Sequence, residues 1–467
     1  MTPSRDIVIV GGGFAGTALA RALERRLPAG HRVVLVSEES YTTFNPMLAE
    51  VVGAAVFPEH VVAPLRQMLR PASRFIMGRV TGIDTQRCVL EATTLAGRQE
   101  IAYAQLALAF GNRANLELVP GLAEHALPLK LIGDALFIRN RMLQRIARIE
   151  LETDPALRRR LGHFVVLGGG FSGVEVAGTL ADFLRGARRY YPRVAADELR
   201  ISLLEGADRL LLELPASLGA AALRSLRQRG IDVRLGARAA SVDAAGVTLA
   251  DGTRLDSATV VCTIGTRPNP LAAQLGLPLE RGRIVTAPDL SVPGAPGVWA
   301  LGDCALVRNA APPARAAAGA ASGASTSGAS ASGASGTPAF APPTAQFAVA
   351  EARFLAANIA ARLAGRPTRA FSHVSRGAMA TTGHLKGVAQ VAGLRLAGLP
   401  AWLLWRAYYL LQMPTLGRKL RIWVEWTWAM FFPADITHLR FTRTGEADAE
   451  PAPLPLSGAP LANAPTR

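Results

Sequence analysis

The sequence contains little cysteine, and the cysteines it has are dispersed. Its three cysteines, Cys88, Cys262 and Cys304, lie far apart, and no two of them form a C-x-x-C pair. This spacing argues against a dithiol redox centre and favours a reducing compartment. Histidine is also scarce, with seven residues scattered along the chain. The sequence therefore offers no cluster of metal ligands, and we expect no metal.

Long hydrophobic runs are missing as well. No uncharged apolar run reaches the roughly 18 residues that a membrane-spanning helix needs. The first expected strand begins near Asp6, so we expect no signal peptide. The sequence therefore predicts neither a signal peptide nor a membrane-spanning helix.

Acidic residues are too few to balance the basic ones. The 467 residues include 51 Lys and Arg against 35 Asp and Glu, which gives a formal net charge of +16. Such an excess indicates an anionic partner, either nucleic acid or an anionic membrane surface. The hydrophobic fraction of 50% allows sizeable cores, and the length predicts two or three domains.

A glycine-rich turn follows the first expected strand. The β-branched run Ile7–Val10 is typical of a buried parallel strand. Gly11, Gly13 and Gly16 then fit G-x-G-x-x-G, and a helix is expected over Thr17–Arg26. The first glycine permits the tight turn, the second lets the backbone approach a pyrophosphate, and the third lets helix pack on strand. The helix N-terminus favours phosphate. A turn without ligand is the alternative, but strand, motif and helix together favour a dinucleotide.

The acid that would hold the adenosine ribose at this first turn is less clearly marked. A second strand is expected over Arg32–Val36, and an acid normally ends such a strand. Ser37 occupies that position. We therefore assign the role to Glu38 and keep Glu39 as the alternative.

The same turn occurs a second time, because "VVLGGGFSGVEVAG" nearly repeats "VIVGGGFAGTALAR". A strand is expected over His163–Leu167, and a helix over Val174–Arg185. Gly168, Gly170 and Gly173 repeat the motif between them. Two dinucleotide sites in one chain suit a resident redox cofactor and a transient hydride donor, as in a flavin–nicotinamide oxidoreductase.

Two carboxylates distinguish the second turn. Glu205 ends the expected strand Arg200–Leu204, where it would accept the ribose hydroxyl and repel a 2′-phosphate, so NADH is favoured over NADPH. Arg209 is a nearby cation that would weaken this preference. Glu175 aligns with Ala18 of the first turn. It either complements the helix dipole or points toward a nicotinamide ring beside a flavin.

The segment from Gly398 to Phe432 differs from the rest of the chain. It contains five of the six tryptophans, together with basic residues at helical spacing such as Arg418 and Arg421. Tryptophan favours the headgroup level of a bilayer, and basic amphipathic helices lie in that plane. We therefore expect this segment to bind an anionic membrane surface; a dimer interface or a tryptophan-rich core is the alternative. No recognised nucleic-acid motif is present, and no nucleic acid is expected.

As a set, several motifs resemble one family. Both glycine turns, "FNPML", "PLKLIGDALFIRNRML", "GVEVAG", "ALGDCA", "PPTAQFA", "GAMATTG" and "AWLLWRAYYLL" are similar to type II NADH:quinone oxidoreductases, over about Arg5 to Leu439. The resemblance implies an α/β fold with two Rossmann-like dinucleotide-binding domains, the second inserted into the first, and a C-terminal amphipathic membrane-anchoring region.

The resemblance also implies a division of the chain. The FAD-binding domain would comprise residues 1–128 and 289–397, with a low-complexity insert near 309–343. The NADH-binding domain would comprise residues 129–288. Residues 398–444 would form the membrane-associating region, and residues 445–467 a disordered tail.

The roles of individual residues follow from the same resemblance. Gly11, Gly13, Gly16 and Glu38 would bind FAD together with Asp303 of "GDCA", for which a turn-forming role is the alternative. NADH would bind at Gly168, Gly170, Gly173 and Glu205, and Glu175 would lie near the contact of nicotinamide and flavin. The rest of the cofactor-binding set is Pro46, Gly111, Gly265 and Ala345.

The quinone site is the least complete part of the resemblance. The family's AQ-x-A-x-Q motif lines that site, and here the chain has "AQFAVAEA". Ala345, Gln346 and Ala348 match, but Ala350 replaces the second glutamine. Gln346 is the candidate for contact with quinone. Lys386 is a candidate for proton supply, with a surface lysine as the alternative.

The implied reaction transfers two electrons from NADH through FAD to a quinone, ubiquinone or menaquinone, without pumping protons. It would occur on a peripheral protein at the cytoplasmic face of the cell membrane. A homodimer is compatible with this arrangement. One alternative is a sulfide:quinone oxidoreductase, although the three dispersed cysteines fit that chemistry poorly. The other is an NADH-binding flavoprotein that acts as a sensor or interaction module.

Overall fold

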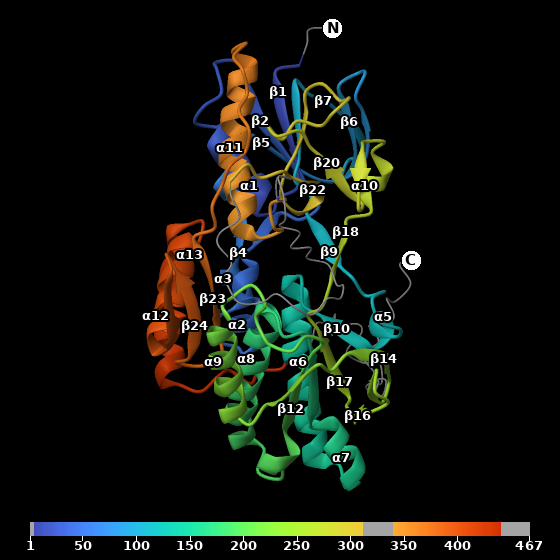
Figure 1. Cartoon of the computed structure of the whole chain (residues 1–467), viewed down its shortest axis with the longest axis vertical. Coiled ribbons are helices and arrows are strands. Elements are labelled where there is room, and N and C mark those ends of the chain that lie inside the picture. Colours follow the sequence, from blue (N-terminus) through green and yellow to red (C-terminus); the bar gives the residue numbers. More distant parts are fainter. Residues whose placement is uncertain (1–3, 312–339, 440–467) are drawn as a thin grey trace. The chain divides into compact units, whose positions relative to one another are not determined.

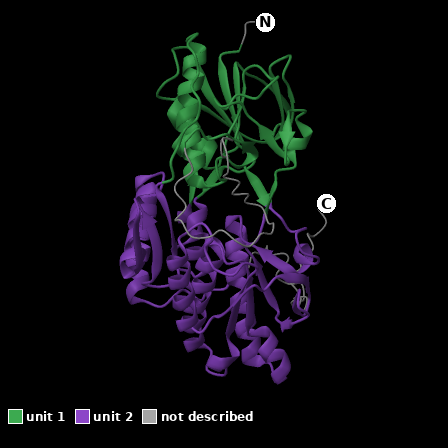
Figure 2. Cartoon of the chain, in the orientation of Figure 1, with its two compact units in different colours: residues 1–43, 62–113, 266–375 green, residues 44–61, 114–265, 376–467 purple. Residues whose placement is uncertain are grey.

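The computed structural model describes residues 4–311 and 340–439. The chain forms two compact units, and each is assembled from three separate segments (Figure 2). Unit 1 contains Met1–Thr43, Val62–Arg113 and Thr266–Ser375. Unit 2 contains Phe44–Val61, Ala114–Gly265 and Arg376–Arg467. The segments of the two units therefore alternate along the chain.

Unit 1 is built on a seven-stranded sheet with the order β21-β8-β1-β2-β5-β6-β7 (Figure 1). The strands from β21 to β5 pair in parallel, and β5, β6 and β7 pair antiparallel. Helices α1 and α11 pack against each other beside this sheet. The bounds are β1 Asp6–Val10, α1 Phe14–Leu23, β2 Arg32–Ser37, β5 Arg74–Asp84, β6 Val89–Thr94, β7 Gly97–Ala102, β8 Gln105–Leu108, β21 Val298–Ala300 and α11 Ala345–Leu363.

The core of unit 1 lies around its parallel strands. Four residues of β1 and five of β2 are buried, as expected for strands that are covered on both faces. Shorter elements complete the unit: β3 Tyr41–Thr43, β4 Val62–Pro64, α4 Leu65–Met68, α10 Leu271–Gln274, β19 Leu279–Glu280, β20 Arg283–Val285, η4 Gly302–Cys304 and β22 Ala305–Leu306. The short strands β9 Asn112–Ala114 and β18 Thr266–Pro268 carry the chain out of unit 1 and back into it.

Unit 2 contains a five-stranded parallel sheet with the order β10-β17-β11-β12-β13. A three-stranded antiparallel sheet, β14-β15-β16, accompanies it. The bounds are α5 Leu122–His125, β10 Ala126–Pro128, α6 Ile132–Leu151, α7 Pro155–Leu161, β11 His163–Leu167, α8 Phe171–Ala187, η2 Arg188–Tyr190, η3 Ala196–Glu198, β12 Arg200–Glu205, α9 Ala216–Gln228, β13 Asp232–Leu235, β14 Ala239–Asp243, β15 Gly246–Leu249, β16 Arg254–Asp256 and β17 Thr259–Cys262.

The C-terminal part of unit 2 packs on the helices of that sheet. The strands β23 Gly377–Thr381, β24 Gly387–Val391 and β25 Leu394–Gly398 form an antiparallel sheet. Helix α8 packs on β23, α9 on β24, and α12 Leu399–Gln412 on all three strands (Figure 1). Helix α13 Leu416–Phe431 contacts α12 and α3 Pro58–Val61. The segment before α3 forms η1 Asn45–Met47 and α2 Leu48–Val52.

The strands predicted around the two glycine turns are confirmed, and the helices after them begin earlier than predicted. Helix α1 begins at Phe14 and α8 at Phe171, each directly after the second glycine of its motif. Gly13 and Gly170 act as N-caps in extended conformation, without a side-chain cap. The third glycine therefore lies inside the first helical turn, where the prediction had placed loop.

The unit boundaries differ from the predicted domain boundaries at 128 and 288. Residues 114–128 belong with unit 2 because β10 pairs with β17 in its parallel sheet. Residues 266–288 belong with unit 1 because β20 pairs with β22. Residues 376–397 group with unit 2 through β23 and β24. Most of the low-complexity insert, and the whole predicted tail, lie outside the described residues.

The C-terminal helices are shorter than a bilayer is thick. Helix α12 has 14 residues and α13 has 16. Over residues 4–311 and 340–439, no helix has both the length and the low charge that a membrane crossing requires.

Candidate functional site

The glycines of the first turn have the environments that their predicted roles require. Gly11 has a φ of +108°, and a Cβ on it would lie 2.4 Å from the carbonyl oxygen of Ala109. A Cβ on Gly16 would lie 1.9 Å from the carbonyl oxygen of Gly11, so only glycine allows helix α1 to pack this closely on the turn. A Cβ on Gly13 would meet nothing within 4 Å. Gly13 therefore faces the open side, where a pyrophosphate would approach the backbone.

The second turn repeats this geometry within unit 2. Gly168 has a φ of +104°, and a Cβ on Gly173 would lie 1.8 Å from the carbonyl oxygen of Gly168. A Cβ on Gly170 again meets nothing within 4 Å. Since α8, like α1, begins without a side-chain cap, both helix starts are suited to an anionic ligand.

The residues that end β2 and β12 occupy equivalent positions and differ in charge. The N–H of Gly169 donates to Glu205 Oε2 at 2.6 Å, and the N–H of Ala207 donates to Glu205 Oε1 at 2.7 Å. At the first turn, the N–H of Gly12 donates to Ser37 Oγ at 3.2 Å. The position of an acid is therefore taken by Ser37 in unit 1, as the sequence indicated.

Glu38 projects beyond that position. Its carboxylate lies 3.4 Å from the guanidinium groups of both Arg79 and Arg113. The side chain of Glu38 remains 40% exposed, so it can still accept a hydrogen bond from a ligand hydroxyl. Its assignment to the ribose stays a prediction.

Arg209 is held by two backbone carbonyl groups of its own loop. Its guanidinium donates to the carbonyl oxygens of Leu214 at 2.8 Å and Leu212 at 2.9 Å. The sequence suggested that this cation would weaken the preference set by Glu205. Its two hydrogen bonds brace the loop that follows β12, and its effect on the preference stays a prediction.

The turn that contains Asp303 is held in place by a buried carboxyl group to which the sequence pattern gave no role. Glu351 of α11 is 3% exposed, and its Oε2 accepts from the N–H of Gly302 at 2.6 Å. Burial raises the pKa of Glu351 to about 7, while this hydrogen bond and the nearby Arg283 oppose the rise. Glu351 thus fixes the Gly302–Cys304 turn that carries Asp303.

Glu175 is buried within unit 2 rather than placed at the helix start. It lies in the second turn of α8 and is 7% exposed. One carboxylate oxygen accepts from the N–H of Thr381 at 3.2 Å and from Trp405 Nε1 at 3.0 Å. Burial raises the pKa of Glu175 to about 8, although both hydrogen bonds lower it. A role as a simple complement of the helix dipole does not account for this burial.

The "GVEVAG" motif explains how Glu175 reaches these partners. A Cβ on Gly178 would lie 2.5 Å from the carbonyl group of Thr382. Only glycine at this position lets α8 approach the end of β23 so closely. The backbone N–H of Thr381 can then reach the carboxylate one turn earlier on α8.

A second carboxyl group and a cation lie in the same interior, and the sequence pattern indicated neither. Glu50 of α2 is 8% exposed and accepts from Trp426 Nε1 at 3.2 Å. Burial raises the pKa of Glu50, and Arg406 opposes the rise. The guanidinium of Arg406 stacks on Trp402 and Trp426, 3.9 and 4.7 Å from the ring centroids.

The other predicted site residues are dispersed over both units. In unit 1, Gln346 lies in the first turn of α11 and accepts from Ser375 Oγ at 3.1 Å. In unit 2, Lys386 is exposed and donates to Gln228 Oε1 at 3.2 Å. Of the remaining cofactor-binding candidates, Gly111 and Ala345 belong to unit 1, and Pro46 and Gly265 to unit 2.

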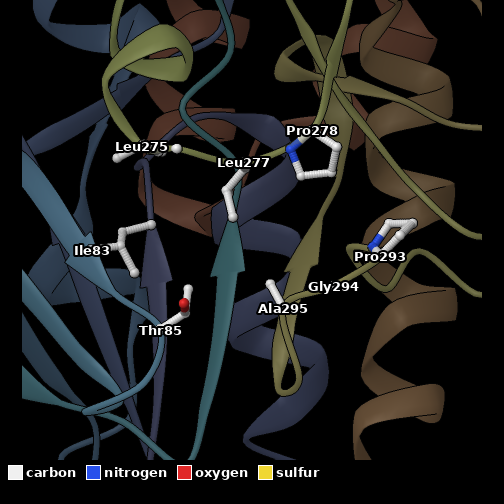
Figure 3. Close-up of a pocket in the computed structure, with 9 residues that line it drawn as sticks. Ile83, Thr85, Leu275, Leu277, Pro278, Pro293, Gly294 and Ala295 are labelled. Atoms are coloured by element: carbon white, nitrogen blue, oxygen red, sulfur yellow. The ribbon is translucent and has the colours of Figure 1, made fainter.

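The described residues contain no group of side chains suited to a metal, and their three cysteines are free thiols. Cys262 and Cys304 are buried. Unit 1 also holds a pocket of about 300 Å³ near the end of β5, lined by Ile83, Leu277, Ala295 and neighbouring residues (Figure 3). Its lining contains no charged side chain and no predicted site residue.

Comparison with known proteins places the chain in a family. Residues 5–331 match the family of pyridine nucleotide-disulphide oxidoreductases. The chain is 30% identical to type II NADH:quinone oxidoreductase Ndh of Mycobacterium tuberculosis over 446 residues, which covers 90% of this chain and 87% of the relative. It is 29% identical to demethylphylloquinone reductase NdbB of Synechocystis over 436 residues, with coverages of 91% and 96%.

The fold is also similar to a solved structure. The structure of NDH2 from Plasmodium falciparum in complex with NADH matches with a TM-score of 0.80 and 18% identity, over 92% of this chain and 99% of that one. This likeness confirms the predicted α/β fold. With the family match and the 30% identical relative, it shows that the chain belongs to the pyridine nucleotide-disulphide oxidoreductases and, among them, to the type II NADH:quinone oxidoreductases.

Proposed function

We propose that this protein uses FAD to transfer two electrons from NADH to a membrane quinone, without pumping protons. The observation that carries the proposal is the repeated turn: each unit holds one G-x-G-x-x-G motif whose second glycine is open to a ligand. The family relatives named as NADH:quinone oxidoreductases support it. No described feature favours the sulfide:quinone or sensor alternatives.

The residues of unit 1 fit FAD. The open face of Gly13 and the uncapped start of α1 suit the pyrophosphate. Asp303 lies in the Gly302–Cys304 turn, which Glu351 fixes, and it would contact the same cofactor. When bound, FAD supplies the two-electron redox chemistry. The chain itself binds, orients and insulates the reactants.

The residues of unit 2 fit NADH. Gly170 presents the open start of α8 to the pyrophosphate, and both oxygens of Glu205 are oriented by backbone N–H groups. A carboxylate fixed in this way keeps lone pairs for a ribose hydroxyl. A 2′-phosphate at the same place would be repelled by this carboxylate, because the two backbone hydrogen bonds fix its orientation.

We expect Glu205→Gln to narrow the preference for NADH over NADPH. The substitution removes the negative charge that repels the 2′-phosphate, and even half-screened by solvent a unit-charge repulsion of about 4 kcal/mol at 4 Å and a dielectric constant near 20 exceeds the roughly 1.4 kcal/mol of a tenfold effect. The NADH/NADPH ratio of kcat/KM should therefore fall about tenfold. Asp208→Asn, which removes an exposed charge three residues later, serves as the control. An unchanged ratio in the Glu205 variant would mean that the ribose is held elsewhere.

The acceptor is proposed from the partial AQ-x-A-x-Q motif. Gln346 is oriented by Ser375 at the start of α11, and Ala350 leaves a small side chain where the family has a second glutamine. Gln346 would donate its amide to a quinone carbonyl oxygen. The quinone type, ubiquinone or menaquinone, is left to experiment.

Gln346→Leu should slow the reoxidation of the enzyme by quinone and leave its reduction by NADH near normal. The loss of one hydrogen bond to a bound carbonyl costs about 1–2 kcal/mol, which corresponds to roughly tenfold in rate. Stopped-flow absorbance separates the two half-reactions. Gln274→Leu, at an exposed position of α10, is the matched control. If the NADH half-reaction slows instead, the quinone assignment is wrong.

The C-terminal helices supply a surface suited to a membrane. We call it the C-terminal apolar face; it comprises exposed side chains of α12, α13 and the residue after α13: Leu403, Leu411, Leu416, Leu420, Trp423, Val424, Trp428, Met430, Phe431 and Phe432. Arg418, Lys419 and Arg421 lie along the same helix. Apolar and basic groups together favour an anionic lipid surface. We propose peripheral binding at the cytoplasmic face of the membrane.

The first test is direct. The purified protein should contain a yellow flavin, and it should oxidise NADH when a quinone is added. Several quinones should be compared in the same assay. A protein without flavin, or one that binds NADH without quinone-dependent turnover, would contradict the proposal.

A further inference from the structure

Three elements of unit 1 meet around one buried carboxyl group. Gly302 lies between the starts of two helices, because a Cβ on it would lie 3.1 Å from the Cβ of Ala15 in α1 and 3.8 Å from that of Ala348 in α11. Glu351, three residues after Ala348 on α11, is 3% exposed and accepts from the N–H of Gly302 at 2.6 Å. Its carboxyl group therefore lies against the Gly302–Cys304 turn, close to the start of α1.

The charged groups at this place do not balance. Burial has the largest influence on Glu351 and raises its pKa to about 7; Arg283 of β20 opposes the rise, and Asp303 of the adjoining turn adds to it. Two carboxylates against one guanidinium leave one uncompensated negative charge beside a buried group, which is costly. A proton on Glu351 removes that surplus.

The other titratable groups around Glu351 do not offset the charge, as far as the described residues go. Cys304 stays a neutral thiol, because burial raises its pKa to about 12. Helix α1 has no titratable side chain between Phe14 and Ala20. Arg353, the next cation along α11, is exposed to solvent. Arg283 is therefore the cation that matters for the charge state of Glu351.

FAD would bring further negative charge to the same place. Its pyrophosphate is assigned to the start of α1, at the open face of Gly13, two residues before Ala15. A bound cofactor also displaces water from the site. Both effects disfavour the ionised form of a neighbouring carboxyl group. Glu351 should therefore hold a proton more tightly in the complex with FAD than in the flavin-free protein.

We propose that the binding of FAD takes up one proton, and that Glu351 holds this proton while the cofactor is bound. The proton comes from solvent and forms an O–H bond on the carboxylate, and no electrons move. The inference rests on the proposed function, which assigns FAD to unit 1, and deepens it by linking the retention of the cofactor to pH. Glu351 is thus a positioning residue whose charge state sets the affinity for FAD.

The sign of the pH dependence follows from this linkage. Below about pH 6, Glu351 is protonated with or without FAD, so the affinity should be constant. Above about pH 7, only the complex keeps the proton, and the dissociation constant of FAD should rise by up to about tenfold for each pH unit. The rise ends where the pH exceeds the pKa of Glu351 in the complex. FAD should therefore be lost on the alkaline side.

The dissociation constant is measured on the purified holoenzyme. The protein is diluted at pH values from about 6 to about 9, and released FAD is measured by its fluorescence; in wild type the dissociation constant should rise about tenfold or more over this range. Glu351→Gln keeps an oxygen that accepts from the N–H of Gly302 but cannot ionise. Its dissociation constant should stay constant, so at the alkaline end it should bind FAD more tightly than wild type by the same factor.

Arg283→Gln removes the cation that favours the ionised form of Glu351. Glu351 then keeps its proton to higher pH in the flavin-free protein as well, so the rise in the dissociation constant should begin at a higher pH than in wild type. Glu100→Gln is the matched control, because it removes a charge that is 56% exposed in β7 of the same unit. Its pH profile should match that of wild type.

Tighter binding by Glu351→Gln than by wild type at alkaline pH supports the proposal, because structural damage would weaken binding instead. A dissociation constant that is independent of pH in wild type, or that rises equally in Glu351→Gln, overturns the inference and leaves the proposed function intact. If Glu351→Gln does not fold, the Arg283 variant decides: a later onset supports the proposal and an unchanged onset overturns it. A purified wild type without flavin would contradict the proposed function and this inference together.

Discussion

Gly13→Val is expected to yield a folded protein that contains almost no FAD. The Gly13 backbone is extended, with φ −78° and ψ −165°, which suits a β-branched residue. The new Cβ meets no protein atom within 4 Å, so the fold should survive. The side chain instead occupies the space that the pyrophosphate needs. Losing two charged hydrogen bonds, at about 1.5–3 kcal/mol each, lowers FAD affinity at least about 100-fold.

Gly170→Val is the matched control, because the second turn has the same geometry. Gly170 has φ −74° and ψ −171°, and its Cβ also meets nothing within 4 Å. This variant should keep its flavin and lose NADH binding. Flavin content follows from the absorbance of the purified protein, and NADH binding from calorimetry. A normal flavin content in Gly13→Val would contradict the assignment of FAD to unit 1.

Replacing Trp423, Trp428 and Phe431 together by glutamine should weaken binding to anionic vesicles about 100-fold. These side chains are 56%, 60% and 75% exposed, while Ile422 and Trp426, which seat α13, stay unchanged. An aromatic side chain gains less at an interface than the roughly 1.5–3 kcal/mol of full burial. With about 1 kcal/mol for each, the three together account for the expected factor.

Vesicle sedimentation measures this loss, and a triple variant at Leu95, Leu118 and Leu151 is the control. These three leucines are 89%, 51% and 78% exposed but lie outside the C-terminal apolar face. The part of binding that comes from Arg418, Lys419 and Arg421 should fall with added salt. Undiminished binding of the α13 variant would contradict the proposed membrane surface.

Point variants are preferred to truncation because α12 belongs to the interior of unit 2. Trp405 of α12 donates to Glu175, and Trp402 and Trp405 are 2% and 1% exposed. A chain cut before Gly398 would remove the indole donors of Glu175 and Glu50. The sequence indicated an amphipathic segment, with a dimer interface or a tryptophan-rich core as the alternative, but it did not show that buried tryptophans of this segment donate to carboxyl groups elsewhere in unit 2.

The sequence alone predicts the features that depend on local backbone requirements. The glycine motifs, the strands before them and Glu205 at the end of β12 follow from spacing, because only glycine tolerates a φ near +105° or a neighbour within 2 Å. The start of each helix was missed by three residues. The cap is the backbone of the second glycine, so no polar side chain marks it.

The residues that the sequence missed are those defined by distant contacts. Glu50 and Trp426 lie 376 positions apart, and Glu351 reaches the N–H of Gly302 across 49 positions. A weak signal for the two acids was present in the sequence. Glu50 is the lone carboxylate of the apolar run "MLAEVVGAAV", and Glu351 is that of "FAVAEARFLAA". A lone acid in such a run is usually buried with a partner, but the sequence does not identify that partner.

The central claim is tested most directly in vesicles that carry both a quinone and a trapped pH indicator. NADH is added anaerobically to the membrane-bound holoenzyme, and NADH, quinol and luminal pH are followed together. The account predicts one quinol formed for each NADH consumed, with no change of luminal pH. NADH oxidation without quinol, or quinol formation coupled to a change in luminal pH, would contradict it.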